Sequence, residues 1–281
     1  MTTPAPTEPA LSMRGVTIRR GGRTLVEDLD LDVEPGEFLA ILGPNGSGKS
    51  SLLQVLLGTL SPTSGTIRVD GRSPGDQSAR VGVIPQQRSF DPSLTMRGRD
   101  LVRLGIDGNR YGPGLPGTGR KLRGRVEAAL DSVSARELAD TTMGRMSGGQ
   151  QQRVRTAQAL VGDPRLLCCD EPLLSLDLPG QRTIAGTLRK RKEEDDTAIL
   201  FVTHEINPVL PLVDRVLYLV DGRHRIGTPE EVITTETLTD LYNFQVDVVE
   251  VRGQLVVIGD NQPLVTEPHS HGPPHHEEGH H

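Results

Sequence analysis

The residues with the clearest chemistry form a glycine-rich octapeptide, Gly43-Pro44-Asn45-Gly46-Ser47-Gly48-Lys49-Ser50. It matches the phosphate-binding loop pattern, with a β-type run before it and an apolar helical run after it, which is the context that the pattern requires. The glycines let backbone N–H groups converge on phosphate oxygens, and the following helix adds the positive end of its dipole. Lys49 supplies a point charge and Ser50 a ligand for Mg²⁺. The octapeptide, with Ser51 after it, therefore predicts a nucleoside triphosphate site that uses Mg²⁺.

Two adjacent acids follow the apolar run Leu166 to Cys169. Asp170, at the tip of the expected strand, can hold Mg²⁺ through water, and Glu171 can orient or deprotonate an attacking water. An acid pair after a strand is also common on solvated surfaces, but here it complements the phosphate loop. Cys168 and Cys169 are the only cysteines, and we expect them to pack in the core of a protein from a reducing compartment.

The composition of the chain limits which classes of partner it can bind. The chain has 281 residues and a formal charge of −6, without a long Lys/Arg block, which argues against a general affinity for nucleic acid. The longest apolar runs are far shorter than the roughly 20 residues of a membrane-spanning helix, so a membrane role requires a partner. Residues 1–10 lack the features of a secretory signal and are expected to be a disordered leader.

The order of the predicted elements indicates a mostly parallel sheet wrapped by helices. Short β-type runs at 37–42, 165–169 and 199–202 alternate with helical stretches such as 50–57. In such folds ligands lie at the carboxyl ends of the strands. Residues 88–163 differ in texture and predict an inserted helical lobe, with a Gly/Pro-rich loop at 105–119 and helices at 120–138 and 149–161.

The C-terminal part predicts smaller units. Residues 230–242 are expected to form one or two short helices, and 244–259 a β-hairpin that turns at Arg252-Gly253. Residues 260–281 consist largely of Pro, His and Glu, offer almost nothing to bury, and are expected to be a disordered tail.

A second loop makes a family recognisable. Ser147-Gly148-Gly149-Gln150, followed by Gln151-Gln152-Arg153, resembles the signature sequence of ABC ATPases. The resemblance spans roughly residues 11–240 and implies the ATP-hydrolysing subunit of an ABC transporter. The implied fold is α/β: a P-loop ABC ATPase at 11–243 with a mostly parallel sheet core, an antiparallel β subdomain and the inserted helical subdomain. In this family the signature binds the γ-phosphate held by the other subunit, which implies an ATP-dependent, head-to-tail homodimer.

The resemblance assigns further roles. Gln86 resembles the Q-loop glutamine that reaches Mg²⁺ and the water, Asp177 in Ser175-Leu176-Asp177 resembles the D-loop, and His204 resembles the switch histidine that contacts the γ-phosphate. Lys49, Glu171 and His204 are the implied catalytic residues. Two positions depart from the pattern. Arg20 stands where an aromatic residue usually stacks on adenine and is expected to stack its guanidinium there, and Met146 replaces a commoner Leu.

Two features address the transported substrate. The tail contains six of the eight histidines: His269, His271, His275, His276, His280 and His281. Their imidazoles suit Zn²⁺, although an expression tag or a solubilising tail has the same composition. The stretch Asn207-Pro208-Val209-Leu210-Pro211 resembles the ATPases of zinc and manganese importers. Both favour import of a transition metal, with zinc ahead of manganese.

The expected arrangement is a subunit on the cytoplasmic face of the membrane, docked on a separate permease and served by an extracytoplasmic metal-binding protein. An ABC ATPase for another substrate, such as an iron-chelate, shares every catalytic motif. A soluble ABC ATPase of DNA repair or translation usually has paired cassettes or a long coiled-coil insertion, and a GTPase needs an Asn-Lys-x-Asp motif; neither is present.

Overall fold

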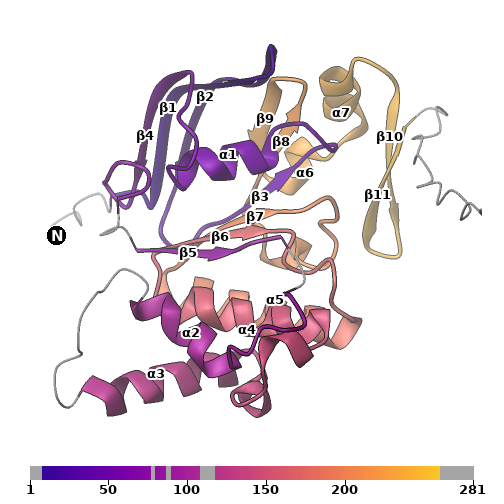
Figure 1. Cartoon of the computed structure of the whole chain (residues 1–281). Helices are drawn as coiled ribbons and strands as arrows, with labels where there is room; N and C mark the ends of the chain where they lie inside the picture. The colour runs from indigo at the N-terminus through magenta and orange to yellow at the C-terminus, as the bar shows by residue number, and fades with distance from the viewer. Residues whose placement is uncertain (1–7, 77–79, 87–89, 108–117, 260–281) are drawn as a thin grey trace, which may run out of the picture.

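A six-stranded sheet forms the centre of the computed structural model, which describes residues 8–76, 80–86, 90–107 and 118–259 (Figure 1). The strand order is β5-β6-β7-β3-β8-β9, and every neighbouring pair is parallel except β8-β9. This arrangement confirms the expected mostly parallel core. The strands are β5 (Val81–Ile84), β6 (Leu166–Asp170), β7 (Ala198–Val202), β3 (Phe38–Leu42), β8 (Arg215–Val220) and β9 (Arg223–Gly227).

The central sheet is buried on both faces. On β3, Phe38, Ala40 and Leu42 belong to one core cluster, while Leu39 and Ile41 belong to another. Side chains of a strand alternate between its two faces, so each face of the sheet packs against its own layer. This double burial explains why the strands are continuous apolar runs in the sequence.

The antiparallel subdomain covers one face of the central sheet. It is a three-stranded sheet of order β2-β1-β4, and α1 lies between it and the central sheet (Figure 1). Leu52, Leu53 and Leu56 of α1 share a core with side chains from both sheets. The phosphate loop that precedes α1 is therefore held by two sheets. The elements are β1 (Leu11–Arg20), β2 (Arg23–Val33), β4 (Ser64–Val69) and α1 (Lys49–Leu56).

The helical lobe lies on the other side of the central sheet, and it differs from the prediction at two points. Gly105 was expected in a loop but lies inside α2. Its glycine serves packing: a Cβ there would be 2.2 Å from the Gln158 carbonyl oxygen, so only glycine permits this approach of α2 to α4. The helix expected at 120–138 is two pieces, because Ser134 has φ 52° and breaks the helix. The elements are α2 (Gly98–Asp107), α3 (Thr118–Ser132), a 3₁₀ turn (Arg136–Leu138), a second 3₁₀ turn (Met143–Arg145) and α4 (Gly148–Leu160).

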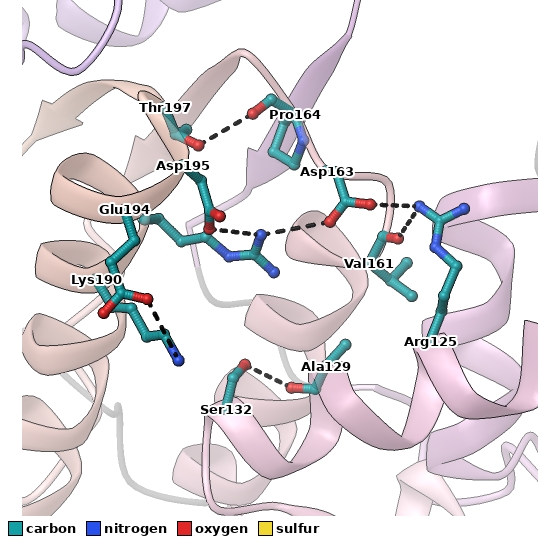
Figure 2. A network of polar contacts seen from close by, with 11 residues as sticks. Arg125, Ala129, Ser132, Val161, Asp163, Pro164, Lys190, Glu194, Asp195 and Thr197 are labelled. Atoms are coloured by element: carbon teal, nitrogen blue, oxygen red, sulfur yellow. Dashed lines mark hydrogen bonds and ion pairs between the residues drawn. The ribbon is translucent and has the colours of Figure 1, made fainter.

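Polar contacts join this lobe to α5 (Leu178–Asp195), as Figure 2 shows. Asp163, just after α4, accepts a 2.8 Å bond from Arg125 of α3 and a 3.4 Å bond from Arg191 of α5. Arg125 also donates to the Val161 carbonyl oxygen at 2.7 Å. In both ion pairs the Asp163 carboxylate is largely exposed, so we expect each to add at most about 1 kcal/mol to stability, and the contacts mainly fix the relative positions of the three helices.

The C-terminal part consists of two short helices and a separate hairpin. The helices are α6 (Pro229–Val232) and α7 (Thr235–Tyr242), and β10 (Val246–Val251) pairs with β11 (Gln254–Gly259). Arg252 and Gly253, at the turn, have φ of 54° and 77°. Positive φ at both central residues is the feature of a type I′ turn, whose twist suits a two-residue hairpin loop. Residues 1–7 of the expected leader and the whole His-rich tail lie outside the described residues.

A 3₁₀ turn at Leu210–Leu212 completes the described elements. Within the part of the chain that the structure describes, none of the helices has the length and hydrophobicity that a bilayer crossing requires.

Candidate nucleotide site

The phosphate loop connects the end of β3 to the start of α1 through two glycines that no other residue could replace. Gly43 has φ 140°, and a Cβ there would be 2.1 Å from the Leu219 carbonyl oxygen. Gly48 has φ 107°, and its added Cβ would be 2.9 Å from the Cβ of Leu25. Gly48 is also the N-cap of α1 and makes no side-chain capping bond, so the helix N-terminus keeps N–H donors for an anion.

Lys49 is buried and turned toward its own loop. Its ammonium donates to the carbonyl oxygens of Gly43 at 2.6 Å and Pro44 at 2.9 Å. Burial lowers the pKa of Lys49, and the nearby charges of Glu171 and Asp170 partly oppose that shift. The charge is thus held in place by backbone oxygens beside the loop, ready to transfer its hydrogen bonds to phosphate oxygens.

The two acids leave the end of β6 in different conformations. Asp170 is the last residue of the strand; burial and the neighbouring Glu171 raise its pKa, against the opposing effects of Lys49 and a hydrogen bond from the Ser50 hydroxyl. Glu171 has φ 47°, a left-handed conformation that is rare and unfavourable for a glutamate. Its N–H donates to the Val202 carbonyl oxygen of β7 at 2.9 Å, which holds the turn.

Gln86 and His204 both contact the Glu171 carboxylate. The Gln86 amide nitrogen lies 3.4 Å from Oε2, and the His204 Nδ1 lies 3.3 Å from Oε1. These residues follow β5, β6 and β7, which are neighbours in the sheet. Their convergence results from parallel strands that end at one edge, as the sequence predicted.

A hollow of about 240 Å³ lies among these groups. Most of its lining residues were predicted from the sequence, while Leu25 and Val202 were not, because neither carries a motif. The predicted residues that line it are Asn45, Gly46, Gly48, Lys49, Ser50, Ser51, Gln86, Asp170 and Glu171. Two larger hollows, one between α2 and α3 and one between α3 and α5, lie among surface Arg, Asp and Glu side chains and contain none of the phosphate-loop residues. Arg20 does not line the 240 Å³ hollow.

The signature residues lie elsewhere, at the start of α4. Ser147 is the N-cap: its hydroxyl accepts from the Gln150 N–H at 3.3 Å, and the Gln150 side chain accepts from the Ser147 N–H at 2.9 Å. A Cβ on Gly149 would be 3.5 Å from the Ser175 carbonyl oxygen, so the signature adjoins the segment that ends in Asp177. Ser147, Gly148, Gly149 and Gln150 do not line the hollow of the same chain.

Asp177 has a structural task in this chain. It is the N-cap of α5, and its carboxylate accepts from the Gly180 N–H at 3.0 Å. It does not line the hollow, and the leucines beside it, Leu174 and Leu178, are 54% and 69% exposed. Asp177 therefore lies outside the hollow of its own chain.

The residues at the phosphate loop fit a nucleotide with Mg²⁺. The Ser50 hydroxyl and the Asp170 carboxylate lie together, and the buried Ser47 hydroxyl has no hydrogen-bond partner. Among the described residues, no group of three or more His, Cys, Asp or Glu side chains forms a complete metal site. Mg²⁺ at phosphoryl-transfer sites typically takes only one or two protein oxygens and completes its shell with phosphate and water.

Known proteins resemble the chain in both sequence and structure. A family model described as ABC transporter matches residues 26–174, more than half of the chain. A structure assigned to a metal-chelate type ABC transporter, in an inward-facing conformation, is 25% identical and covers 92% of this chain and 100% of its own, with a TM-score of 0.74.

Two further solved cassettes are similar. MJ0796, in a dimeric post-hydrolysis state with ADP and Pi, is 29% identical over 78% of this chain and 98% of its own, with a TM-score of 0.67. CbiO1 from Clostridium perfringens, part of the ABC transporter complex cbiONQ, is 28% identical over 84% of this chain and 95% of its own, with a TM-score of 0.68.

Proposed function

Since the chain belongs to the ABC transporter family and has its ATPase fold, we propose that it powers the import of a transition-metal ion, zinc ahead of manganese. In this proposal it binds a separate permease on the cytoplasmic face of the membrane, and an extracytoplasmic metal-binding protein delivers the ion. The observation that carries the catalytic part is the convergence of Gln86 and His204 on Glu171 beside the phosphate loop.

The geometry supports hydrolysis by activation of water. The Glu171 side chain is 14% exposed, and it orients the attacking water or accepts its proton. The water attacks the γ-phosphorus, and the ADP oxygen leaves on the opposite side. Lys49 transfers its hydrogen bonds from its own loop to phosphate oxygens. His204, half exposed and 3.3 Å from Glu171, is placed to contact the γ-phosphate. Ser50 and Asp170 would hold Mg²⁺, which neutralises phosphate charge when bound.

A second copy of the chain completes the site in this proposal. Ser147 and its neighbours open a helix whose dipole favours an anion, yet the hollow of their own chain does not include them. The exposed Leu174 and Leu178 flank the adjoining Asp177 segment, and such apolar side chains fit a protein interface. The dimeric MJ0796 structure is similar in fold, which supports a head-to-tail homodimer.

The substrate assignment rests on composition. The six tail histidines, His269 to His281, carry the nitrogen ligands that Zn²⁺ prefers, and the similar metal-chelate type transporter supports a metal in the broad sense. That same structure favours the iron-chelate alternative, which uses identical catalytic residues. The two readings differ only in what the permease accepts.

The decisive experiment is to purify the full chain with its membrane partner in lipid nanodiscs and to measure ATP turnover with the delivery protein loaded with Zn²⁺, Mn²⁺ or an iron-chelate. We expect stimulation by zinc, less by manganese, and none in Glu171→Gln. Stimulation by the iron-chelate alone would replace zinc with the alternative. Equal turnover under every condition would reject metal import.

The tail is tested separately. We expect deletion of residues 261–281 to leave basal ATP turnover intact and to lower the amount of Zn²⁺ bound in equilibrium dialysis at neutral pH. Because protons compete for the imidazole nitrogens, binding to the full chain should fall as the pH drops through about 6.5. Equal zinc binding by both proteins would make the tail a solubilising extension and would remove it as support for zinc.

A further inference from the structure

The side-chain amide of Asn207 joins the loop after β7 to the C-terminal hairpin. Its nitrogen donates to the Leu255 carbonyl oxygen at 3.0 Å, and its oxygen accepts from the Leu255 N–H at 2.9 Å. Both ends of the amide thus bind the backbone of one residue, 48 positions away in sequence. We call this pair of bonds the Asn207 clasp. It satisfies both polar backbone groups of Leu255 on strand β11, which pairs only with β10 among the described strands.

The clasp lies three residues from His204. His204 itself lies in a tight turn, in which the Thr203 hydroxyl accepts from the Glu205 N–H at 3.0 Å and donates to the Glu205 carbonyl oxygen at 2.8 Å. Ile206 is buried in the core. The backbone that carries His204 is therefore fixed on one side by Thr203 and on the other by the clasp, while the His204 side chain itself is 51% exposed.

The hairpin is a firm support because it has anchors of its own. The Val248 N–H donates to the Thr235 hydroxyl of α7 at 2.9 Å, and the Val246 N–H donates to the Thr239 hydroxyl at 3.1 Å. Val246 is buried, and Val248 packs against the main core. In Figure 1 the hairpin lies at one side of the molecule, beyond α7.

From these contacts we propose that Asn207 is a positioning residue for ATP hydrolysis, which uses the hairpin to fix His204 against Glu171. The inference rests on the role of His204 in the proposed function. The Asn207 to Pro211 stretch then has a structural role, because its asparagine binds the hairpin. The resemblance of this stretch to metal importers is therefore weaker support for a metal substrate than the sequence alone indicated.

The test compares steady-state ATP hydrolysis by the full-length chain and its variants. We expect Asn207→Ala to lower kcat about tenfold and to change the KM for ATP less than twofold, because the phosphate loop is untouched. Gln245→Ala is the matched control: it removes an amide from the same C-terminal unit, but among the described residues that amide bonds to its near neighbour Asp247, at 3.1 Å. Its turnover should stay within twofold of the wild type.

A double-variant cycle separates positioning from general destabilisation. If Asn207 acts through His204, the variant with both Asn207→Ala and His204→Ala should turn over no more slowly than His204→Ala alone. Losses that multiply, or wild-type turnover in Asn207→Ala, would overturn the inference. If Asn207→Ala does not fold, as judged by circular dichroism, Asn207→Asp keeps the acceptor for the Leu255 N–H and replaces it in the cycle.

Failure of the proposed function has a different signature. Wild-type turnover in Glu171→Gln would reject the proposed catalytic site, and wild-type turnover in His204→Ala would reject the role of His204 and the positioning inference with it. Normal effects of both variants, with no effect of Asn207→Ala, would reject the positioning inference alone.

Discussion

The N-termini of α1 and α4, the two helix ends that we propose contact phosphate, are built in opposite ways. At α1 the N-cap is Gly48, with φ 107° and no capping side chain, so the first N–H groups remain available. At α4 the N-cap is Ser147, which forms a reciprocal capping box with Gln150. A capping box satisfies the donors that an anion would otherwise use. The first helix start is therefore ready for an anion, while the capping box at the second occupies two of its N–H groups, those of Ser147 and Gln150.

The two helix starts also differ in the charged groups near them. At α1 the buried Lys49 has a lowered pKa and Asp170 a raised one, so the region keeps charges in unfavourable surroundings. The signature Ser147-Gly148-Gly149-Gln150 contains only neutral groups. Perturbed charges are a cost in stability that binding sites tolerate for function. We therefore expect α1 to supply the affinity for ATP and α4 to act on a phosphate that is already bound.

The largest expected effect is at Glu171, the proposed catalytic carboxylate. We expect Glu171→Gln to bind ATP as the wild type does and to lose a hundredfold or more in kcat, because binding uses Lys49 and backbone donors while turnover needs the carboxylate. Calorimetric titration and a phosphate-release assay measure the two quantities. Hydrolysis at the wild-type rate would show that Glu171 has no catalytic role.

Lys49→Ala tests the claim that α1 supplies the affinity. The variant removes the only side-chain cation among the residues that line the described hollow, and we expect ATP to bind at least about tenfold more weakly, a loss of ~1.4 kcal/mol or more. Titration of the nucleotide, with the unfolding midpoint as a check on folding, gives the answer. Affinity unchanged within twofold would mean that backbone donors alone hold the phosphates.

Ser147→Ala is the matched variant at the other helix. We expect ATP affinity of the monomer to stay within twofold, and kcat to fall about tenfold if the serine acts across a dimer. Loss of the cap should also destabilise the protein by about 0.5–2 kcal/mol. Turnover measured against protein concentration separates these effects, because a dimer defect is concentration-dependent. A loss of monomer affinity equal to that of Lys49→Ala would erase the distinction between the two regions.

Much of this site could be predicted because its parts are local. The phosphate loop, the acid pair and His204 each follow a strand, and parallel strands of one sheet bring their carboxyl ends together without further information. The lobe was harder to predict. Gly105 has a composition typical of loops, yet it lies in α2 because α2 and α4 approach closely there, which is a tertiary contact that no local pattern shows.

Partner choices over long sequence distances could not be predicted either. The Asn207 amide pairs with Leu255, 48 residues away. An asparagine or aspartate in a loop has many available hydrogen bonds, so its type alone does not identify the partner. Leu25 and Val202 line the hollow through packing, and their sequence environment is that of any apolar strand residue.

Arg20→Ala tests whether the nucleotide site near α1 also contacts the adenine base. If the guanidinium stacks on adenine, the variant should bind ATP more weakly by about 0.5–2 kcal/mol, the range of a cation–π contact, and Arg20→Tyr should bind at least as well as the wild type. Titration with ATP and with inorganic triphosphate distinguishes the base from the phosphates, since only ATP binding should change. Identical ATP affinity in the wild type and the alanine variant would exclude Arg20 from the site.

The smallest expected effect concerns the cost of the charges at α1. Because burial and Glu171 raise the pKa of Asp170, its ionised form destabilises the empty folded protein, and this cost disappears as the pH falls through the folded pKa toward the unfolded value of about 3.9. Asp170→Asn should therefore raise the unfolding midpoint of the nucleotide-free protein at pH 7.5. The gap should narrow only as the pH falls through the folded pKa of Asp170. With Mg-ATP present the order should reverse, because the variant lacks a ligand for the metal. A midpoint that is lower than that of the wild type at every pH without nucleotide would show that the attraction of Lys49 and the Ser50 hydrogen bond outweigh burial, and the α1 region would then be as relaxed as the start of α4.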